Sequence, residues 1–212
     1  MRDVYHEELD SIGATLIEMT GLVALALNEA TEALMNADLQ LAEKVIAADD
    51  AVDGLQKALD ARALDLLARQ QPVAGDLRTI ITSLRMSADL ERMGDLARHV
   101  AKVARLRYPE IAIPEELRET VAEMGRIGEE LARKTGDIID GRDVEAARLL
   151  ESEDDAMDRL HRALFSALLH EGTPYPVETA IDVTLVGRYY ERFADHAVSV
   201  ARRMVFLVTG EY

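Results

Sequence analysis

The hydrophobic positions follow a helical period through nearly the whole chain. Apolar residues recur every three or four positions in long segments, which is typical of amphipathic α-helices. The first three segments cover residues 9–36, 39–70 and 76–107, and the same succession is repeated beyond residue 114. We expect the fifth helix to end by Leu168, before the Gly and Pro residues of 172–176, and the last helix to end near Val208. An apolar stripe is buried only against neighbouring helices, so the pattern predicts an all-α fold of six long helices in two tandem three-helix bundles.

Two acidic motifs occur twice, which indicates an internal duplication. One motif recurs 100 residues later: Glu91-Arg92-Met93-Gly94-Asp95 and Glu191-Arg192-Phe193-Ala194-Asp195. The other recurs 105 residues later: Asp49-Asp50-Ala51-Val52-Asp53 and Asp154-Asp155-Ala156-Met157-Asp158. Asp38 and Asp143 are also 105 residues apart, and each is expected to cap the helix that follows it. Two prolines between Tyr108 and Pro114 favour a first domain over 1–108, a linker over 109–114 and a second domain over 115–212.

Composition narrows the class of protein. Hydrophobic residues make up 49% of the 212 residues but aromatic residues only 4%, which suits helices better than sheets. The formal net charge of −16 disfavours nucleic acid as a partner. The absence of cysteine fits a reducing compartment. No run of about 18 apolar residues and no signal peptide are recognisable, so we expect a cytoplasmic protein without direct membrane insertion.

The duplicated acids are the candidate chemistry. Residues four apart share one helix face, so Glu91 and Asp95 are neighbours, on the side opposite the apolar stripe and therefore facing outward. Asp49 and Asp53 flank the stripe of the preceding helix, so the four carboxylates can meet at the rim of a groove. Such a set suits a hard or borderline metal ion. The alternative is ordinary solvated helix surface, partly offset by nearby cations: Arg92, Arg98, Lys102 and Arg192.

Histidines and catalytic motifs add little. His161 follows Asp158 by three residues, and His99 and His196 lie close in sequence to Asp95 and Asp195, so they are secondary candidate ligands. The sequence shows no Gly-rich nucleotide loop and no local arrangement that indicates a Ser or Cys nucleophile. Any enzyme here would therefore have to work through a bound metal ion.

Two three-helix halves that each carry a D-x-x-x-D motif and an E-x-x-x-D motif resemble the PhoU family of phosphate-signalling regulators. The resemblance implies a cytoplasmic, non-catalytic negative regulator of phosphate uptake and of the phosphate-starvation response, bridging the ATPase subunit of the phosphate ABC transporter and a sensor histidine kinase. It also implies, in some members, surface-bound multinuclear iron or zinc clusters. Because paired bundles often dimerise, we expect a homodimer. The ligands here would be two sets of four acids: Asp49, Asp53, Glu91 and Asp95, and Asp154, Asp158, Glu191 and Asp195. Leu96 stands where the second copy has His196, so no histidine is shared by both sets.

Two other classes of protein remain open on the sequence. A carboxylate-bridged iron store or oxidase is the first, although ferritin-like sites need two Glu-x-x-His motifs and this chain offers only Asp158-x-x-His161. A helical adaptor that binds no metal is the second. It predicts that alanine is tolerated at Asp95 and Asp195.

Overall fold

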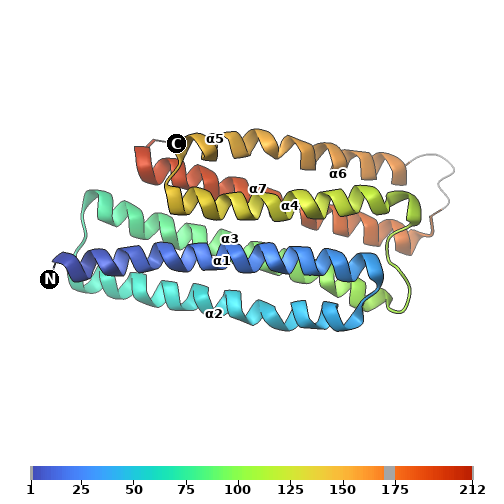
Figure 1. Cartoon of the computed structure of the whole chain (residues 1–212), viewed down its shortest axis with the longest axis horizontal. Coiled ribbons are helices and arrows are strands. Elements are labelled where there is room, and N and C mark those ends of the chain that lie inside the picture. The colour runs from blue at the N-terminus through green and yellow to red at the C-terminus, as the bar shows by residue number, and fades with distance from the viewer. Residues whose placement is uncertain (1, 170–174, 212) are drawn as a thin grey trace.

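The computed structural model describes residues 2–169 and 175–211, and the side chains from residue 7 onward. This part of the chain is all-helical and holds no strand. The elements follow the predicted succession (Figure 1): α1 (Arg2–Asn36), α2 (Leu39–Gln70), α3 (Ala74–Arg107), α4 (Glu115–Gly141), α5 (Val144–Glu153), α6 (Asp155–Leu168) and α7 (Val177–Thr209). The break expected at 172–176 lies largely outside the described residues.

One predicted helix is divided in two. The fifth helix of the sequence pattern is interrupted at Asp154, which separates α5 from α6. The backbone of Asp154 stays right-handed helical, with φ −63° and ψ −25°, and its amide still donates to the Leu150 carbonyl. α5 and α6 therefore continue in line in Figure 1 and together form the counterpart of α2.

Matching caps begin the corresponding helices of the two halves. The Asp38 carboxylate accepts a hydrogen bond from the Leu41 amide at 3.0 Å, and the Asp143 carboxylate accepts one from the Ala146 amide at 2.9 Å. Both cap residues have nearly the same extended backbone, with φ and ψ of −85° and 98°, and of −84° and 101°. Both predicted caps are confirmed.

The two halves pack side by side along their length. α1 and α3 contact α4 and α7, whereas α2 lies on one outer side and α5 and α6 on the other (Figure 1). Buried residues of both halves form a single continuous core. The approach is close because α4 carries glycines there: a Cβ at Gly128 would lie 2.5 Å from Leu27 Cδ2, and one at Gly136 would lie 2.6 Å from Thr20 Oγ1. The sequence pattern shows three helices per half but does not reveal this shared seam.

α1 contains a long apolar segment. Within the described residues, its segment Glu7–Asn36 is long and apolar enough to cross a membrane by length and composition, with a hydropathy of 1.4. Such a test is also passed by the core helix of a folded domain. α1 packs against three other helices and buries nine apolar residues: Ile12, Leu16, Met19, Val23, Ala24, Leu27, Ala30, Ala33 and Leu34.

Candidate functional site

The first acidic cluster lies in the groove between α2 and α3. Asp49 and Asp53 come from α2, and Glu91 and Asp95 from α3. Their side chains are 5%, 34%, 19% and 17% exposed, respectively. The expectation that Glu91 and Asp95 face outward is therefore wrong: the apolar stripe of α3 is wide enough to bury part of that face against α2. The four acids do gather in one place, as their spacing predicts.

Three cations accompany this cluster. Arg98 Nη1 lies 2.5 Å from Asp49 Oδ2, and its Nη2 donates to Asp95 Oδ1. The contact with Asp49 is an ion pair only, because Asp49 Oδ2 has no hydrogen-bond partner among the described residues. Arg92 pairs with Asp95 at 3.0 Å and with Glu91 at 3.6 Å. Lys57 lies 4.0 Å from Asp53, so each of the four carboxylates has a cationic neighbour. Two of the cations expected to offset these acids, Arg92 and Arg98, do so.

The second acidic cluster occupies the equivalent place in the other half. Asp154 lies at the junction of α5 and α6, Asp158 is on α6, and Glu191 and Asp195 are on α7. Glu191 is only 15% exposed and pairs with Arg188 at 2.5 Å. Among the described residues, no Lys, Arg or His nitrogen lies within 4.0 Å of the other three carboxylates. Asp154 Oδ1 is buried and has no hydrogen-bond partner there.

The carboxylates within each cluster influence one another's protonation. Burial and the charges of Asp195, Asp158 and Glu191 raise the pKa of Asp154 from 3.8 to about 6. Burial and the charge of Asp195 also raise the pKa of Glu191. Burial is the largest cause of both rises, and the neighbouring negative charges add to it.

Burial is the main cause of the matching shifts in the first cluster. It raises the pKa of Glu91, with the charge of Asp95 adding to the effect. It also raises the pKa of Asp49, but the Arg98 guanidinium opposes that rise. The four carboxylates of each half thus interact electrostatically, and the first set carries an internal counter-charge.

The two clusters differ in how well they fit a metal ion. In the described part of the chain, no three Asp, Glu or His side chains converge closely enough to hold a metal in their present conformations. The second cluster fits iron or zinc in its chemistry, because it offers hard oxygen donors, unpaired charge and the orphaned Asp154 Oδ1. Its carboxylates would have to turn toward a common point to bind one. The first cluster does not fit, because Arg98 lies between the acids of its two helices.

His161 lies beside the second cluster. It packs over Gly187, one turn before Glu191 on α7, and its ring meets Phe165 edge to face at 4.9 Å. Its Nε2 is buried without a hydrogen-bond partner in the described residues. Burial and the charge of Arg188 lower its pKa, which favours the neutral form that can ligate a metal.

The other two histidines serve the seam between the halves. His196 Nδ1 lies 3.0 Å from Asp89 Oδ1 on α3, and Arg203 donates to the other oxygen of Asp89 at 2.7 Å. These two contacts lower the pKa of Asp89. His99 stacks on Tyr189 with ring centroids 5.2 Å apart. His99 and His196 therefore join α3 to α7.

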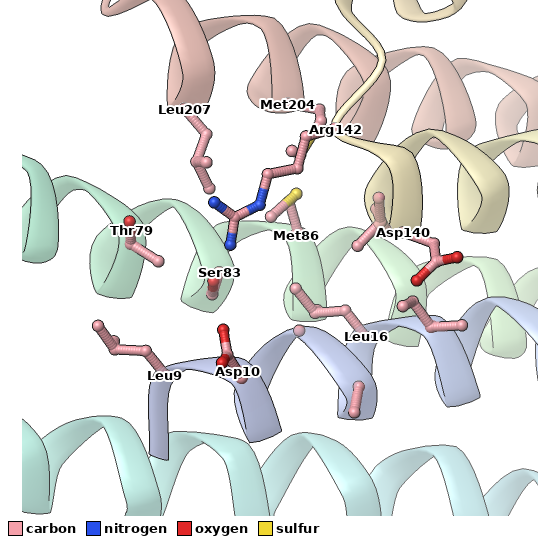
Figure 2. Close-up of a pocket in the computed structure, with 14 residues that line it drawn as sticks. Leu9, Asp10, Leu16, Thr79, Ser83, Met86, Asp140, Arg142, Met204 and Leu207 are labelled. Atoms are coloured by element: carbon pink, nitrogen blue, oxygen red, sulfur yellow. The ribbon is translucent and has the colours of Figure 1, made fainter. Parts of the chain in front are cut away.

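A cavity of about 270 Å³ opens at one end of the seam. It is lined by residues of α1, α3 and α7 and by the end of α4 (Figure 2). Arg142 caps α4 in a left-handed conformation, with φ 50° and ψ 38°, and Figure 2 shows its guanidinium reaching toward Ser83 on α3, opposite Asp10 on α1. None of the predicted acids lines this cavity. No sequence motif could have revealed it, because it forms only where the halves meet.

Exposed apolar rows begin both α3 and α7. Three residues four apart at the start of α3, the first of them its N-cap residue, are 75%, 40% and 38% exposed, and three on α7 are 76%, 53% and 40% exposed: Val73, Leu77 and Ile81, and Val177, Ile181 and Leu185. The two helices run in opposite directions, so the rows lie toward opposite ends of the molecule (Figure 1). The spacing of these rows is visible in the sequence, but only the packing of the helices shows that they are exposed.

Comparison with known proteins places the fold and its doubled acidic site in a class. The PhoU domain profile matches residues 16–104 and again residues 121–204. The chain is 49% identical, over the full length of both, to the "Phosphate-specific transport system accessory protein PhoU homolog 2" of Mycobacterium tuberculosis. It is 48% identical to homolog 1 of Mycobacterium leprae, covering 100% of this chain and 96% of that protein. The crystal structure of PhoU from Pseudomonas aeruginosa matches with a TM-score of 0.89 and 29% identity, over 98% of this chain and 100% of that one.

The all-helical fold together with these matches defines a duplicated protein of the phosphate-transport accessory class. The chain belongs to the PhoU family. This confirms the resemblance inferred from the two acidic motifs, and the structural match confirms the all-α fold.

Proposed function

We propose that this chain is a cytoplasmic negative regulator of phosphate uptake and of the phosphate-starvation response, and that it acts without catalysis. The observation that carries the proposal is the PhoU-family match in both halves of the chain. Two relatives that match along its full length are described as accessory proteins of the phosphate-specific transport system. A regulator of this kind works by contact with partners, so its function depends on the exposed features of the fold.

The proposed partners are the ATPase subunit of the phosphate ABC transporter and a sensor histidine kinase. Two apolar rows, one in each half, support a bridging role because exposed apolar surface of this kind marks protein contact sites. Their placement toward opposite ends leaves room for two partners at once (Figure 1). Leu77→Asp and Ile181→Asp are matched variants of the two rows. We expect each to weaken co-purification of one partner more than of the other, and loss of neither partner would contradict the bridging role.

The acids form the second part of the proposal. Bound iron or zinc would be held by the carboxylates of the second cluster, Asp154, Asp158, Glu191 and Asp195, and would supply fixed positive charge there, against which acidic groups of a partner can dock. The chemistry of the second cluster supports this most clearly. We also propose a homodimer, which analytical ultracentrifugation tests against the 23.5 kDa mass of one chain.

A phosphate-regulon reporter tests the regulatory role. Secreted phosphatase activity is measured in high phosphate in a deletion strain complemented with wild type or with a variant that carries alanine at Glu91, Asp95, Glu191 and Asp195. A matched control carries alanine at four exposed acids outside the clusters: Glu32, Glu43, Glu116 and Glu119. We expect wild type and the control to restore repression and the cluster variant to fail. A deletion strain that stays repressed would contradict the regulatory role, and full rescue by the cluster variant would remove function from the acids.

A further inference from the structure

One position breaks the symmetry of the duplicated acids. The four carboxylates of the first half recur in the second half. The residue three positions after the last of these acids, however, is Arg98 in the first half and Val198 in the second. Each residue lies on the third helix of its half, at the same offset from the acids. The same geometry of four carboxylates is therefore combined with a permanent cation in one half and with an apolar side chain in the other.

Arg98 lies between carboxylates of the two helices that form the first cluster, where a bound metal ion would also have to lie. Its guanidinium reaches Asp49 of α2 at 2.5 Å with one nitrogen and donates to Asp95 of α3 with another. Gly94 permits this arrangement, because a Cβ at that position would lie 3.0 Å from Asp49 Oδ1. An incoming metal would have to displace a side chain that is 27% exposed and held by both helices.

The second cluster has no arginine at the position that corresponds to Arg98. Val198 is 6% exposed and packs into the core, and the methyl group of Ala194 stands where the first half has Gly94. Arg202, the nearest basic residue further along α7, pairs with Glu151 outside the cluster, and it interacts with Asp154 and Asp195 only through charge, without an ion pair within 4.0 Å. Within the described residues, buried atoms without a hydrogen-bond partner occur in both clusters, but Asp49 Oδ2 in the first has the Arg98 guanidinium beside it, whereas Asp154 Oδ1 in the second has no cation within 4.0 Å. Four carboxylates here face one paired cation, Arg188, against three cations in the first cluster.

We infer that Arg98 is the built-in counter-cation of the first cluster, so that the first half excludes metal and only the second half responds to a divalent cation. This inference rests on the metal-binding part of the proposed function. A cation gains little in the first half, since it replaces ion pairs that Arg98 already makes with Asp49 and Asp95. In the second half it neutralises carboxylates of which, among the described residues, only Glu191 has a cation within 4.0 Å.

Metal titration of the purified, metal-stripped full chain tests the inference, with Zn²⁺ as the probe and bound metal counted after desalting. We expect Asp154→Asn/Asp195→Asn to weaken binding by at least tenfold, and the matched pair Asp49→Asn/Asp95→Asn to change it less than twofold. Arg98→Val, which copies the second half, should raise the number of bound ions by opening the first cluster. Arg98→Gln keeps the length of the side chain without its charge and serves if Arg98→Val does not fold.

The outcomes separate this inference from the proposed function. Loss of metal in Asp49→Asn/Asp95→Asn, or no gain of metal in either Arg98 variant, overturns the inference. Metal-free wild type together with metal gained on replacement of Arg98 supports the exclusion by Arg98 but refutes the proposed metal role of the second half. Metal bound by neither wild type nor the Arg98 variants refutes both.

Discussion

The two acidic clusters have the same four acids at the same places in the repeated fold, yet they differ in how their charge is balanced. In the first, guanidinium groups and a lysine lie beside all four carboxylates. In the second, among the described residues, only Glu191 has a cation within 4.0 Å, and the pKa of Asp154 is raised to about 6 by burial and by the neighbouring carboxylates. Duplication preserved the acids, and single residues around them decided whether each cluster is balanced internally or left to bind something from outside.

The largest expected effect comes from removing Arg98. In metal-free protein, Arg98→Val leaves the 5%-exposed Asp49 without its counter-ion, and breaking a partly buried pair costs about 2–3 kcal/mol of unfolding free energy. Urea denaturation at pH 7 measures this loss. A cost below about 0.5 kcal/mol would show that the first cluster does not depend on Arg98.

The pH dependence of stability separates the clusters next. Folding raises the pKa of Asp154 from 3.8 to about 6, so the ionised carboxylate destabilises the fold. The penalty is absent below about pH 4 and complete above about pH 6, and stability therefore falls as pH rises through that window. Asp154→Asn should remove this fall and raise the unfolding free energy at pH 8 by about 1–2 kcal/mol, after allowance for solvent screening.

The matched Asp49→Asn variant is the control for that experiment. Its pH effect should be smaller, because the Arg98 guanidinium opposes the rise in the pKa of Asp49. Urea denaturation of both variants between pH 4 and pH 8 compares them directly. Equal slopes would contradict the difference between the clusters.

Substitutions that remove a feature shared by the two halves should have equal effects on stability. Asp38→Ala and Asp143→Ala each remove a side-chain cap with the same geometry, so each should cost about 1 kcal/mol. Thermal unfolding of the two variants in parallel checks this. A difference above about 1 kcal/mol would mean that the halves differ in more than their cluster cations.

The smallest effect is expected at the rim of the second cluster. Arg188 is 51% exposed, so its pair with Glu191 contributes only about 0–1 kcal/mol. Arg188→Ala should therefore change the unfolding free energy by less than Arg98→Val does, as urea denaturation at pH 7 can show. A larger loss of stability in Arg188→Ala than in Arg98→Val would mean that the second cluster, and not the first, is the internally balanced one.

Much of the fold was readable from local pattern. The helical period located the helices, Asp38 and Asp143 marked two helix starts, and the repeated motifs identified which acids gather. These features depend on residues close in sequence, whose geometry in a helix is fixed by its period. The break at Asp154 was not predicted, because the helical period continues across it and the backbone of Asp154 itself stays helical.

Long-range contacts were decided by the tertiary structure alone. The burial of Glu91 and Asp95 depends on how α2 sits against α3, and the seam depends on glycines of α4 meeting side chains of α1. The cavity with Arg142 exists only because four helices from both halves meet. The sequence named Arg98 among several nearby cations, but which carboxylates a long side chain reaches depends on the packing of two helices. The sequence thus determined which residues carry the charge, and the packing of the helices determined which of those charges are neutralised.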